Sequence, residues 1–220
     1  MASIHSLQVT TGDSYQENCY ILWLAGTFDA VVFDPGESVP EIRAALKENN
    51  LQIAAFLQTH CHFDHIAGLG ALKMSFPAAP LYVPEIEAEW LSRPTLNLSY
   101  FCGGAITAPP ADKLVKENDE ISVAGMRFRA IHVPGHSPGS MVYFVQPSEG
   151  PPHAVAGDTL MRGSIGRGDL PGGEGEDVLV SNIQQRLFTL PGLTLVHPGH
   201  GLETTIDREK LTNPFCGDRR

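Results

Sequence analysis

The sequence has few cysteines and no long apolar segment. Its four cysteines lack any Cys-x-x-Cys pair, so neither a disulfide scaffold nor a cysteine zinc knuckle is indicated, and we expect reduced thiols. No apolar run approaches the ~20 residues that span a bilayer, and Met1–Gln8 lacks the basic and apolar regions of a signal peptide. We therefore expect a cytoplasmic protein with no membrane contact.

Basic residues are also scarce. The chain has 15 Lys and Arg against 25 Asp and Glu, with a formal net charge of −10, and its only adjacent basic pair is Arg219–Arg220. An acidic surface repels a phosphate backbone, so nucleic acid is not an expected partner. A hydrophobic fraction of 42% and a charged fraction of 18% suit a globular core. We expect one αβ domain over residues 1–220, while the oligomeric state is not readable.

Short apolar runs alternate with turns and helical stretches. Ser38–Glu41 fits a capping box that would begin a helix, Arg93–Pro110 reads as a lid or surface excursion, and Arg162–Glu176 is a glycine-rich loop. Two face-to-face sheets with helices outside would bury the apolar runs. The predicted strands are Ile4–Val9, Cys19–Leu24, Ala30–Phe33, Leu51–Gln58, Pro80–Val83, Ile121–Val123, Met126–Val133, Met141–Gln146, Ala154–Ala156 and Leu193–Val196, and the later helices are Ile66–Met74 and Val178–Phe188.

The strongest chemical signal is the segment Thr59–His65, which directly follows an apolar strand. Four metal-competent side chains fall within six residues, and imidazole nitrogens and carboxylate oxygens suit zinc and similar divalent ions. If the segment is extended, alternation places His60, His62 and Asp64 on one side. A turn into a helix at Ile66 would then direct His65 towards a neighbouring point. One short segment can thus serve two adjacent metal ions.

Three further candidates follow strands in glycine-containing turns: His136, Asp158 and His200. Adjacent glycines allow close approach of the backbone, and strand ends gather at one rim of a sheet. A lone histidine after a strand is more often a surface residue than a ligand, but the dense segment and these three positions together predict a metal site. Asp34 is expected either to accept a hydrogen bond from a ligand or to cap its own turn.

Together these motifs resemble the metallo-β-lactamase superfamily over nearly the whole chain. The short glyoxalase-II-like (hydroxyacylglutathione hydrolase-like) members are the most similar, since they share the Asp34-Pro-Gly, Pro134–Gly139, Gly157–Leu160 and Pro198–Gly201 motifs and the Asn213-Pro-Phe tail. The resemblance implies a four-layer αβ/βα sandwich. It also implies that His60, His62 and His136 hold one metal, that Asp64, His65 and His200 hold the other, and that Asp158 bridges them.

The same resemblance implies hydrolysis of a thioester, with a metal-bridging hydroxide as nucleophile and Asp64 and Asp158 as the catalytic carboxylates. Two divalent ions are expected, with zinc as the first candidate and iron or manganese as alternatives. Arg167 could hold a carboxylate of a glutathione conjugate, or could instead pair with Asp169 or Glu174. Arg162 is a weaker candidate for substrate contact. The sequence continues for about twenty residues after His200, so we do not expect the C-terminal helical domain of the long glyoxalase II form.

Two other functions compete with the hydrolase. Persulfide dioxygenases also resemble this chain, and use one iron at positions matching His60, His136 and Asp158. A non-catalytic binding protein on the same fold is the other, although a complete ligand set argues against it because unused ligands would crowd without compensation. Alternation in an extended segment would point the Cys61 side chain away from the metal ions, which favours a small thiol buried in the core. His132 and His197 are expected to pack or to support ligands.

Overall fold

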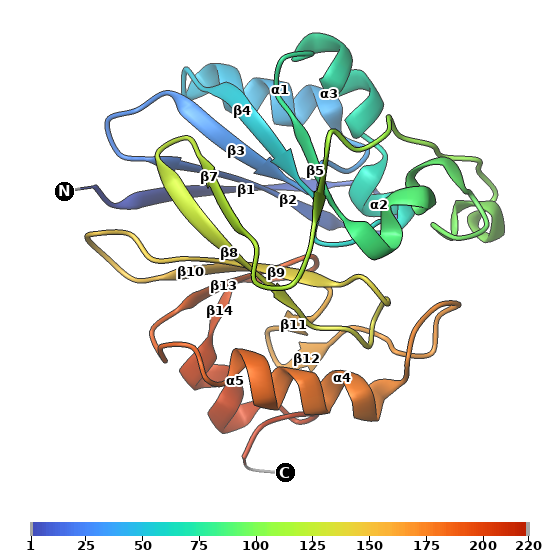
Figure 1. Cartoon of the computed structure of the whole chain (residues 1–220), viewed down its shortest axis with the longest axis vertical. Helices are drawn as coiled ribbons and strands as arrows, with labels where there is room; N and C mark the ends of the chain where they lie inside the picture. The colour runs from blue at the N-terminus through green and yellow to red at the C-terminus, as the bar shows by residue number, and fades with distance from the viewer. Residues whose placement is uncertain (1, 219–220) are drawn as a thin grey trace.

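Two mixed six-stranded sheets face each other at the centre of the molecule (Figure 1). The computed structural model describes residues 2–218, so the basic pair at 219–220 lies outside the described residues. The first sheet has the order β1-β2-β3-β4-β5-β6, antiparallel from β1 to β3 and parallel from β3 to β6. Its strands are β1 (Ile4–Thr11), β2 (Glu17–Leu24), β3 (Asp29–Phe33), β4 (Gln52–Leu57), β5 (Leu81–Pro84) and β6 (Lys113–Val115).

The second sheet has the order β14-β13-β10-β9-β8-β7. Only β10 and β13 pair in parallel, and a separate hairpin of β11 (Leu160–Met161) and β12 (Ser164–Ile165) follows β10. The carboxyl ends of β8, β10 and β13 consequently share one edge of this sheet. Its strands are β7 (Glu120–Val123), β8 (Met126–His132), β9 (Met141–Val145), β10 (His153–Gly157), β13 (Leu195–Pro198) and β14 (Thr204–Thr205).

Helices cover the outer face of each sheet, which gives the four layers predicted from the sequence (Figure 1). Helices α1 (Val39–Glu48) and α3 (Leu69–Ser75) lie over the first sheet. Helix α4 (Glu176–Asn182), its π-helical continuation η3 (Ile183–Leu187) and α5 (Ile206–Thr212) lie over the second. The expectation of an αβ/βα sandwich is confirmed.

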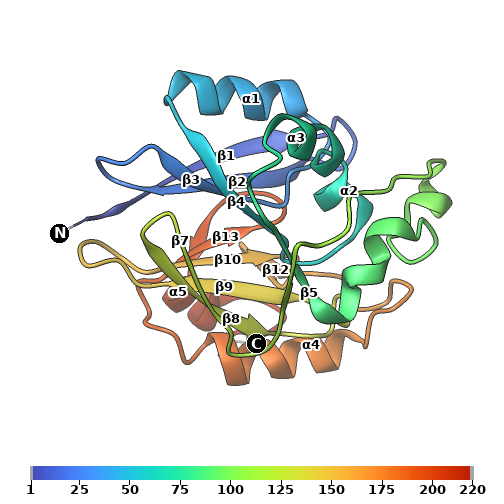
Figure 2. The same cartoon turned by 45° about the horizontal axis from the view of Figure 1, so that its top comes forward.

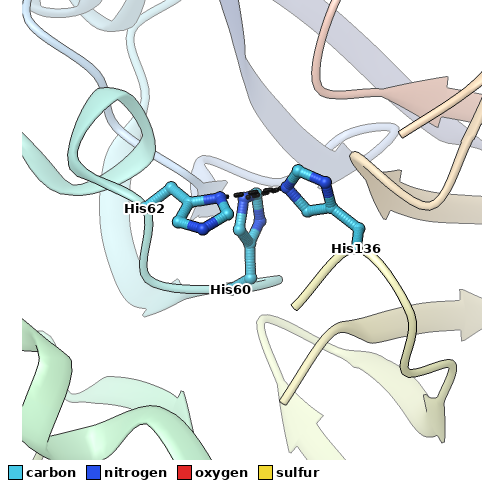
Figure 3. Close-up of side chains that lie close together, drawn as sticks. All are labelled: His60, His62 and His136. Atoms are coloured by element: carbon cyan, nitrogen blue, oxygen red, sulfur yellow. Dashed lines mark hydrogen bonds between the residues drawn. The ribbon is translucent and has the colours of Figure 1, made fainter. Parts of the chain in front are cut away.

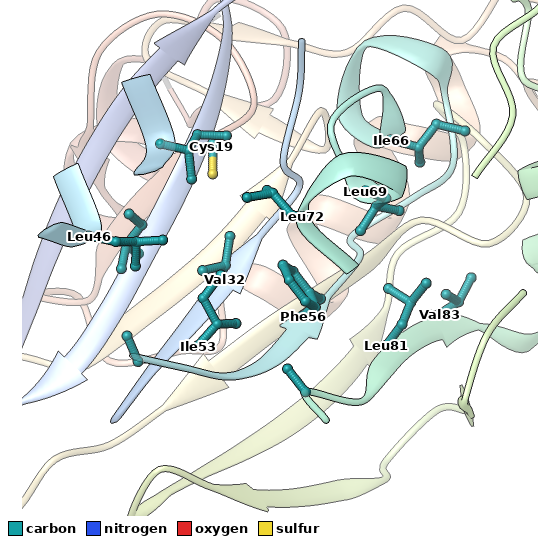
Figure 4. Packing of buried hydrophobic residues seen from close by; sticks show 14 of the residues in the cluster. Cys19, Val32, Leu46, Ile53, Phe56, Ile66, Leu69, Leu72, Leu81 and Val83 are labelled. Atoms are coloured by element: carbon teal, nitrogen blue, oxygen red, sulfur yellow. The ribbon is translucent and has the colours of Figure 1, made fainter. Parts of the chain in front are cut away.

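Three apolar clusters fill the spaces between these layers. Between the sheets, the ring of Phe33 contacts those of Phe128 and Tyr143, with centroids 5.5 and 5.7 Å apart. Between the first sheet and its helices, Leu46 and Leu72 belong to the cluster that surrounds Val32 and Phe56 (Figure 4). A third cluster joins the second sheet to α4, η3 and α5. These cores fix the two sheets relative to each other, and so fix the shared edge.

The region between β5 and β6 projects from the sandwich beside α2 (Phe63–Ile66), drawn in green in Figure 2. It contains two 3-10 helices, η1 (Glu85–Ser92) and η2 (Ser99–Cys102). Tyr100 and Phe101 are exposed, while Leu98 is buried. The segment predicted as a lid or surface excursion thus projects at the surface on a buried base, and the lid alternative stays a prediction.

Local structure departs from the sequence predictions at two helix starts. Ser38 precedes α1 as predicted, but its hydroxyl makes no cap; it accepts a hydrogen bond from the Gly12 N–H at 3.1 Å instead. Where one helix was predicted over Ile66–Met74, the structure has a short helix α2 that ends at Ile66 and a second helix, α3, that begins at Leu69, so Asp64 lies on α2 rather than in an extended segment. The alternation argument that placed Asp64 beside His60 and His62 is therefore wrong.

Shorter elements were missed altogether. The hairpin β11–β12 enters the predicted glycine-rich loop at Ser164–Ile165, and β6, β14 and α5 had no predicted counterpart. These strands have two or three residues each, too few for an alternating pattern to be recognised. Thr205 caps α5 by accepting a hydrogen bond from the Arg208 N–H at 3.3 Å.

Candidate metal centre

Seven side chains of the predicted ligand types meet at the edge between the two sheets. Because both sheets end here, residues distant in sequence become neighbours in space. Gly199 permits the crowding, since a Cβ at that position would lie 2.1 Å from Asp158 Oδ1. His60 and His62 follow β4, Asp64 and His65 lie on α2, and His136, Asp158 and His200 follow β8, β10 and β13.

His60, His62 and His136 form what we call the three-histidine set (Figure 3). His62 Nδ1 lies 3.0 Å from His136 Nε2, which in turn lies 3.3 Å from His60 Nε2. Tetrahedral ligands at zinc–nitrogen distances of 2.0–2.1 Å would stand about 3.3 Å apart. The three nitrogens therefore fit the corners around a cation of that size.

Asp64, His65 and His200 form a second group, the acid–histidine set. Asp64 Oδ2 lies 3.5 Å from His200 Nε2 and 3.9 Å from His65 Nε2. All three residues offer ligand atoms within 4.8 Å of one another. This set mixes carboxylate and imidazole, as many divalent-ion sites do.

Asp158 lies between the two sets. Its Oδ2 is 3.5 Å from both His136 Nε2 and His200 Nε2, and its Oδ1 is 3.4 Å from His65 Nε2. His65 Nε2 and Asp158 Oδ1 are buried without any hydrogen-bond partner. An unsatisfied buried polar atom costs about 1–3 kcal/mol, and a cation would satisfy both. The buried clusters therefore fit a dinuclear metal site.

The three-histidine set is electrically neutral at ordinary pH. Burial, together with the neighbouring imidazoles, holds the pKa of His60 well below its usual value. Burial also lowers the pKa of His62 to about 3, and lowers the pKa of His136. Neutral imidazole is the form that binds metal, so these three side chains need lose no proton to become ligands.

The acid–histidine set is charged. Burial opposes it, but the Asp64 and Asp158 carboxylates hold the pKa of His65 well above its usual value. Against the same burial, hydrogen bonds to Asp158 and Asp64 raise the pKa of His200 to about 10. Burial would raise the carboxyl pKa values of Asp64 and Asp158, yet His65 and the other neighbouring histidines, His200 among them, together outweigh it and lower both. Protons on the two imidazoles thus balance the two carboxylates, and a divalent cation would replace those protons.

Buried acids support the ligand His65 from behind. Asp34 Oδ2 lies 3.1 Å from His65 Nδ1, while Asp34 also accepts hydrogen bonds from the Thr59 N–H at 2.7 Å and the Thr59 hydroxyl at 2.5 Å. Of the two roles predicted for Asp34, contact with a ligand is realised. Glu17 Oε1 lies 3.7 Å from His65 Nδ1, and the Thr11 hydroxyl donates to Glu17 Oε2 at 2.6 Å. Sequence reasoning missed Glu17, which lies two residues before the predicted strand Cys19–Leu24 and is the first residue of β2, at the edge where the site forms.

His132 and His197 pack against or support their surroundings, as predicted. His132 Nε2 donates to the Pro138 carbonyl at 2.8 Å, within the loop that carries His136. His197 Nε2 lies 2.9 Å from His153 Nδ1, and His197 Nδ1 lies 2.8 Å from Glu203 Oε1. Cys61 is fully buried in the core under α3, which confirms that its thiol points away from the centre.

A cavity of about 450 Å³ opens over the centre. Arg167 lines its rim, but its Nε and Nη2 atoms both donate to the Asp169 carboxylate at 2.9 Å, and both side chains are about 70% exposed (69% and 72%). Arg162 is exposed beyond the cavity lining. Side chains from both sheets and from the excursion line the cavity, namely Tyr15, His62, Phe63, Asp64, Leu98, Cys102, His136, Asp158, Met161, Ile165, Leu170 and His200.

A sandwich of this layout, with a buried histidine–aspartate centre at its open edge, defines a class of metal-binding αβ/βα proteins. The family model of the metallo-β-lactamase superfamily matches residues 12–200, and the chain belongs to that superfamily. The chain is 39% identical over 201 residues to the protein named probable metallo-hydrolase YqgX of Bacillus subtilis strain 168, covering 91% of this chain and 92% of the relative. It is 29% identical over 215 residues to the hydroxyacylglutathione hydrolase GloC of Haemophilus influenzae, covering 97% and 99%.

Solved structures agree with this assignment. The crystal structure of the B3 metallo-β-lactamase BLEG-1 superposes with a TM-score of 0.90 at 37% identity, covering 96% of this chain and 99% of the other. The di-iron-bound form of TTHA1623 gives a TM-score of 0.80 at 33% identity, with 95% and 99% coverage. Within residues 2–218, no helix has the length and apolar character needed to cross a bilayer.

Proposed function

We propose that the chain is a dinuclear metal-dependent hydrolase that cleaves thioesters. The observation that carries this proposal is the position of Asp158, whose carboxylate lies within 3.5 Å of imidazole nitrogens from both ligand sets. The superfamily membership and the relative named probable metallo-hydrolase support the hydrolase class. The relative named hydroxyacylglutathione hydrolase supports the thioester.

The ligand assignment follows the two sets. His60, His62 and His136 would hold the first ion, Asp64, His65 and His200 would hold the second, and Asp158 would contact both. Two divalent cations held there would supply a nucleophile by lowering the pKa of water and would polarise the substrate carbonyl. Zinc fits this nitrogen and oxygen set, and so do iron and manganese. The di-iron form of TTHA1623 makes iron a specific candidate.

The chain's own carboxylates position the attacking water. Asp64 and Asp158 both line the cavity, and both are ionised because neighbouring histidines lower their pKa against the effect of burial. Each can accept a hydrogen bond from water and direct a lone pair at the acyl carbon. A thiolate leaves readily because thiol pKa values lie near 8.5, so no strong general acid is required. The described cavity holds no lysine and only one arginine, which suits a leaving group that needs little help.

The leaving thiol is the less constrained half of the substrate. A glutathione conjugate is our first candidate, with Arg167 as its carboxylate contact. Because Arg167 is bound to Asp169 by two hydrogen bonds, a substrate carboxylate would have to replace Asp169. Such an exposed pair is worth little net free energy, so replacement is physically accessible.

A thioester panel tests the proposal. Protein purified without added metal is analysed for its elements, loaded with zinc, iron or manganese, and assayed on S-lactoylglutathione and on thioesters of uncharged thiols. We expect two ions per chain and thioester cleavage that Asp158→Asn slows by about a thousandfold. The proposal fails if the two-metal protein cleaves no thioester, whereas cleavage of uncharged thioesters alone would reject only glutathione.

Two additional substrates belong in the same panel. A β-lactam is included because BLEG-1, at 37% identity, is described as a B3 metallo-β-lactamase. Glutathione persulfide is included with an oxygen electrode. A single iron per chain with oxygen uptake would replace our proposal with the dioxygenase alternative. Metal bound at the candidate ligands, with no turnover of any substrate in the panel, would favour the non-catalytic binding protein.

A further inference from the structure

A second buried acid, Glu87, has no role in the chemistry described so far. It lies on η1, in the excursion between β5 and β6, and its side chain is completely buried. Among residues 2–218, no lysine or arginine forms an ion pair with it. Burial raises its carboxyl pKa, while hydrogen bonds from Ser137, Cys61 and Gly139 act in the opposite direction. A carboxylate buried at this cost calls for a specific explanation.

The partners of Glu87 supply that explanation. Its Oε2 accepts a hydrogen bond from the Cys61 N–H at 2.6 Å, and its Oε1 accepts one from the Gly139 N–H at 2.7 Å. Cys61 lies between His60 and His62, and Gly139 lies three residues after His136. One loop follows β4 of the first sheet and the other follows β8 of the second. A single carboxylate from a third segment therefore joins the two loops that carry the three-histidine set.

We propose that Glu87 is a positioning residue that sets the spacing of His60, His62 and His136 and thereby the affinity of the first metal ion. The imidazole nitrogens stand 3.0 and 3.3 Å apart, and a cation tolerates only small departures from the ~3.3 Å required by tetrahedral bonds. The two hydrogen bonds of Glu87 fix the backbone on both sides of that gap. Residues that support metal ligands from behind commonly change metal affinity by about 10–100-fold. This inference rests on the proposed two-metal centre.

A carboxylate suits this position because it presents an acceptor to each loop. A glutamine would keep one oxygen for one N–H but would turn its own NH₂ group towards the other, which leaves a buried donor unpaired. Gly139 is part of the same arrangement, since a Cβ there would lie 2.8 Å from Glu87 Cγ. That contact involves a side chain rather than the backbone, so Gly139→Ala displaces Glu87 and leaves its carboxylate chemically intact.

The test compares the two metal sites within one protein. Zinc affinities of both sites are measured by chelator competition for the full chain, Glu87→Gln and Gly139→Ala, and Co²⁺ absorption reports the geometry of the three-histidine set. Glu85→Gln is the matched control, because Glu85 lies on the same 3-10 helix in an exposed ion pair with Lys116. Glu17→Gln is the crossed variant, because Glu17 Oε1 lies 3.7 Å from His65 Nδ1 in the other set.

We expect Glu87→Gln and Gly139→Ala to weaken the first ion by about 10–100-fold and to alter its Co²⁺ spectrum, with the second ion changed less than threefold. Glu17→Gln should show the reverse pattern, and Glu85→Gln should match the wild type. Unchanged affinities, or equal losses at both sites, would overturn the inference. If Glu87→Gln does not fold, Gly139→Ala alone decides. A wild-type chain that binds no second ion would count against the proposed function, not against Glu87.

Discussion

The two halves of the candidate centre differ in charge although they share an edge and a bridging aspartate. The three-histidine set is neutral, because burial keeps His60, His62 and His136 from taking up protons. In the acid–histidine set, ionised Asp64 sits against His65 and His200, whose pKa values its charge helps to raise. One half is therefore ready to bind a cation, whereas the other must first release protons.

The supports behind the halves differ in a corresponding way. Behind the three-histidine set, Glu87 binds backbone N–H groups and controls where the loops lie. Behind the acid–histidine set, Asp34 contacts the imidazole of His65 directly and controls its proton and orientation. We therefore expect loop geometry to have the larger influence on the first proposed metal site and protonation to have the larger influence on the second.

The largest effect on activity is expected from Asp158→Asn, because this side chain contacts both ligand sets and its loss would damage both. Asparagine lacks the charge and one of the two oxygens that contact His136, His65 and His200. We expect kcat/KM to fall about a thousandfold, equivalent to roughly 4 kcal/mol of transition-state stabilisation. Steady-state kinetics on the best thioester measure it, with Asp112→Asn, a remote partner of Lys73, as control. A loss below tenfold would show that Asp158 does not join the sets.

The second largest difference between the two halves is expected in the pH dependence of their metal affinities, because only one half must release protons to bind a cation. His65 and His200 have raised pKa values in the metal-free chain, so both are protonated at pH 7 and both protons must leave when a cation binds. Affinity for the second ion should therefore fall about a hundredfold per unit decrease in pH, while the first ion shows little change between pH 6 and 8. Chelator competition at pH 6, 7 and 8 measures both slopes. Equal slopes would contradict the assignment.

Sequence patterns captured the ligands better than their supports. His60 and His62 were recognisable because chemically similar side chains repeat within a few residues after a strand. Glu87 and Glu17 were not, because each is a lone acid that contacts the site through a residue far away in sequence, Cys61 and His65 respectively, and whose burial depends on the packed fold. Asp64 was found as a ligand type but placed by the wrong periodicity, since α2 begins at Phe63.

The same limit applies to the fold. Long apolar strands such as Met126–His132 carry enough pattern to be predicted, and the core they form fixes the two-sheet architecture. The two-residue strand β14 is defined by its pairing with β13, a tertiary contact that no local pattern encodes. Ser38 shows the converse, because a correct local signal was overridden by a hydrogen bond to a distant loop.

The pH dependence of stability in the metal-free chain separates the halves on a smaller scale. His200 has a folded pKa of about 10, above the unfolded value near 6.5, so its contribution is complete below pH 6.5 and is lost as pH rises towards 10. His62 has a folded pKa of about 3, so protonation of the unfolded chain destabilises the fold as pH falls from 6.5 towards 3. Each effect is on the order of 1–3 kcal/mol.

Urea unfolding of chelator-treated protein from pH 5 to 9 measures these slopes. His200→Gln should flatten the alkaline side, and His62→Gln should flatten the acid side, whatever their effects on overall stability. His153→Gln is the control for a buried histidine outside both sets, because burial lowers the pKa of His153 to about 4. It shows how much of the acid slope comes from a residue that belongs to neither set. If either ligand variant changes the slope on the opposite side, the charge difference between the halves is wrong.

The smallest effect is expected at the cavity rim, where the exposed side chains of Arg167 and Asp169 belong to neither ligand set. Asp169→Asn removes the partner of Arg167 but touches no ligand, so both metal affinities and the melting temperature should remain at wild-type values. Freed from Asp169, Arg167 would be available to a substrate carboxylate, and KM for S-lactoylglutathione should fall by about two- to threefold, the scale of an exposed ion pair, while KM for an uncharged thioester stays constant. Parallel kinetics on the two substrates measure the difference. An equal change for both would show that the Arg167 side chain does not read the charge of the leaving thiol, and the comparison of the two metal sites would stand unaffected because only the backbone carbonyl of Arg167, which the substitution leaves in place, contacts a member of either set, His136 Nδ1, at 2.9 Å.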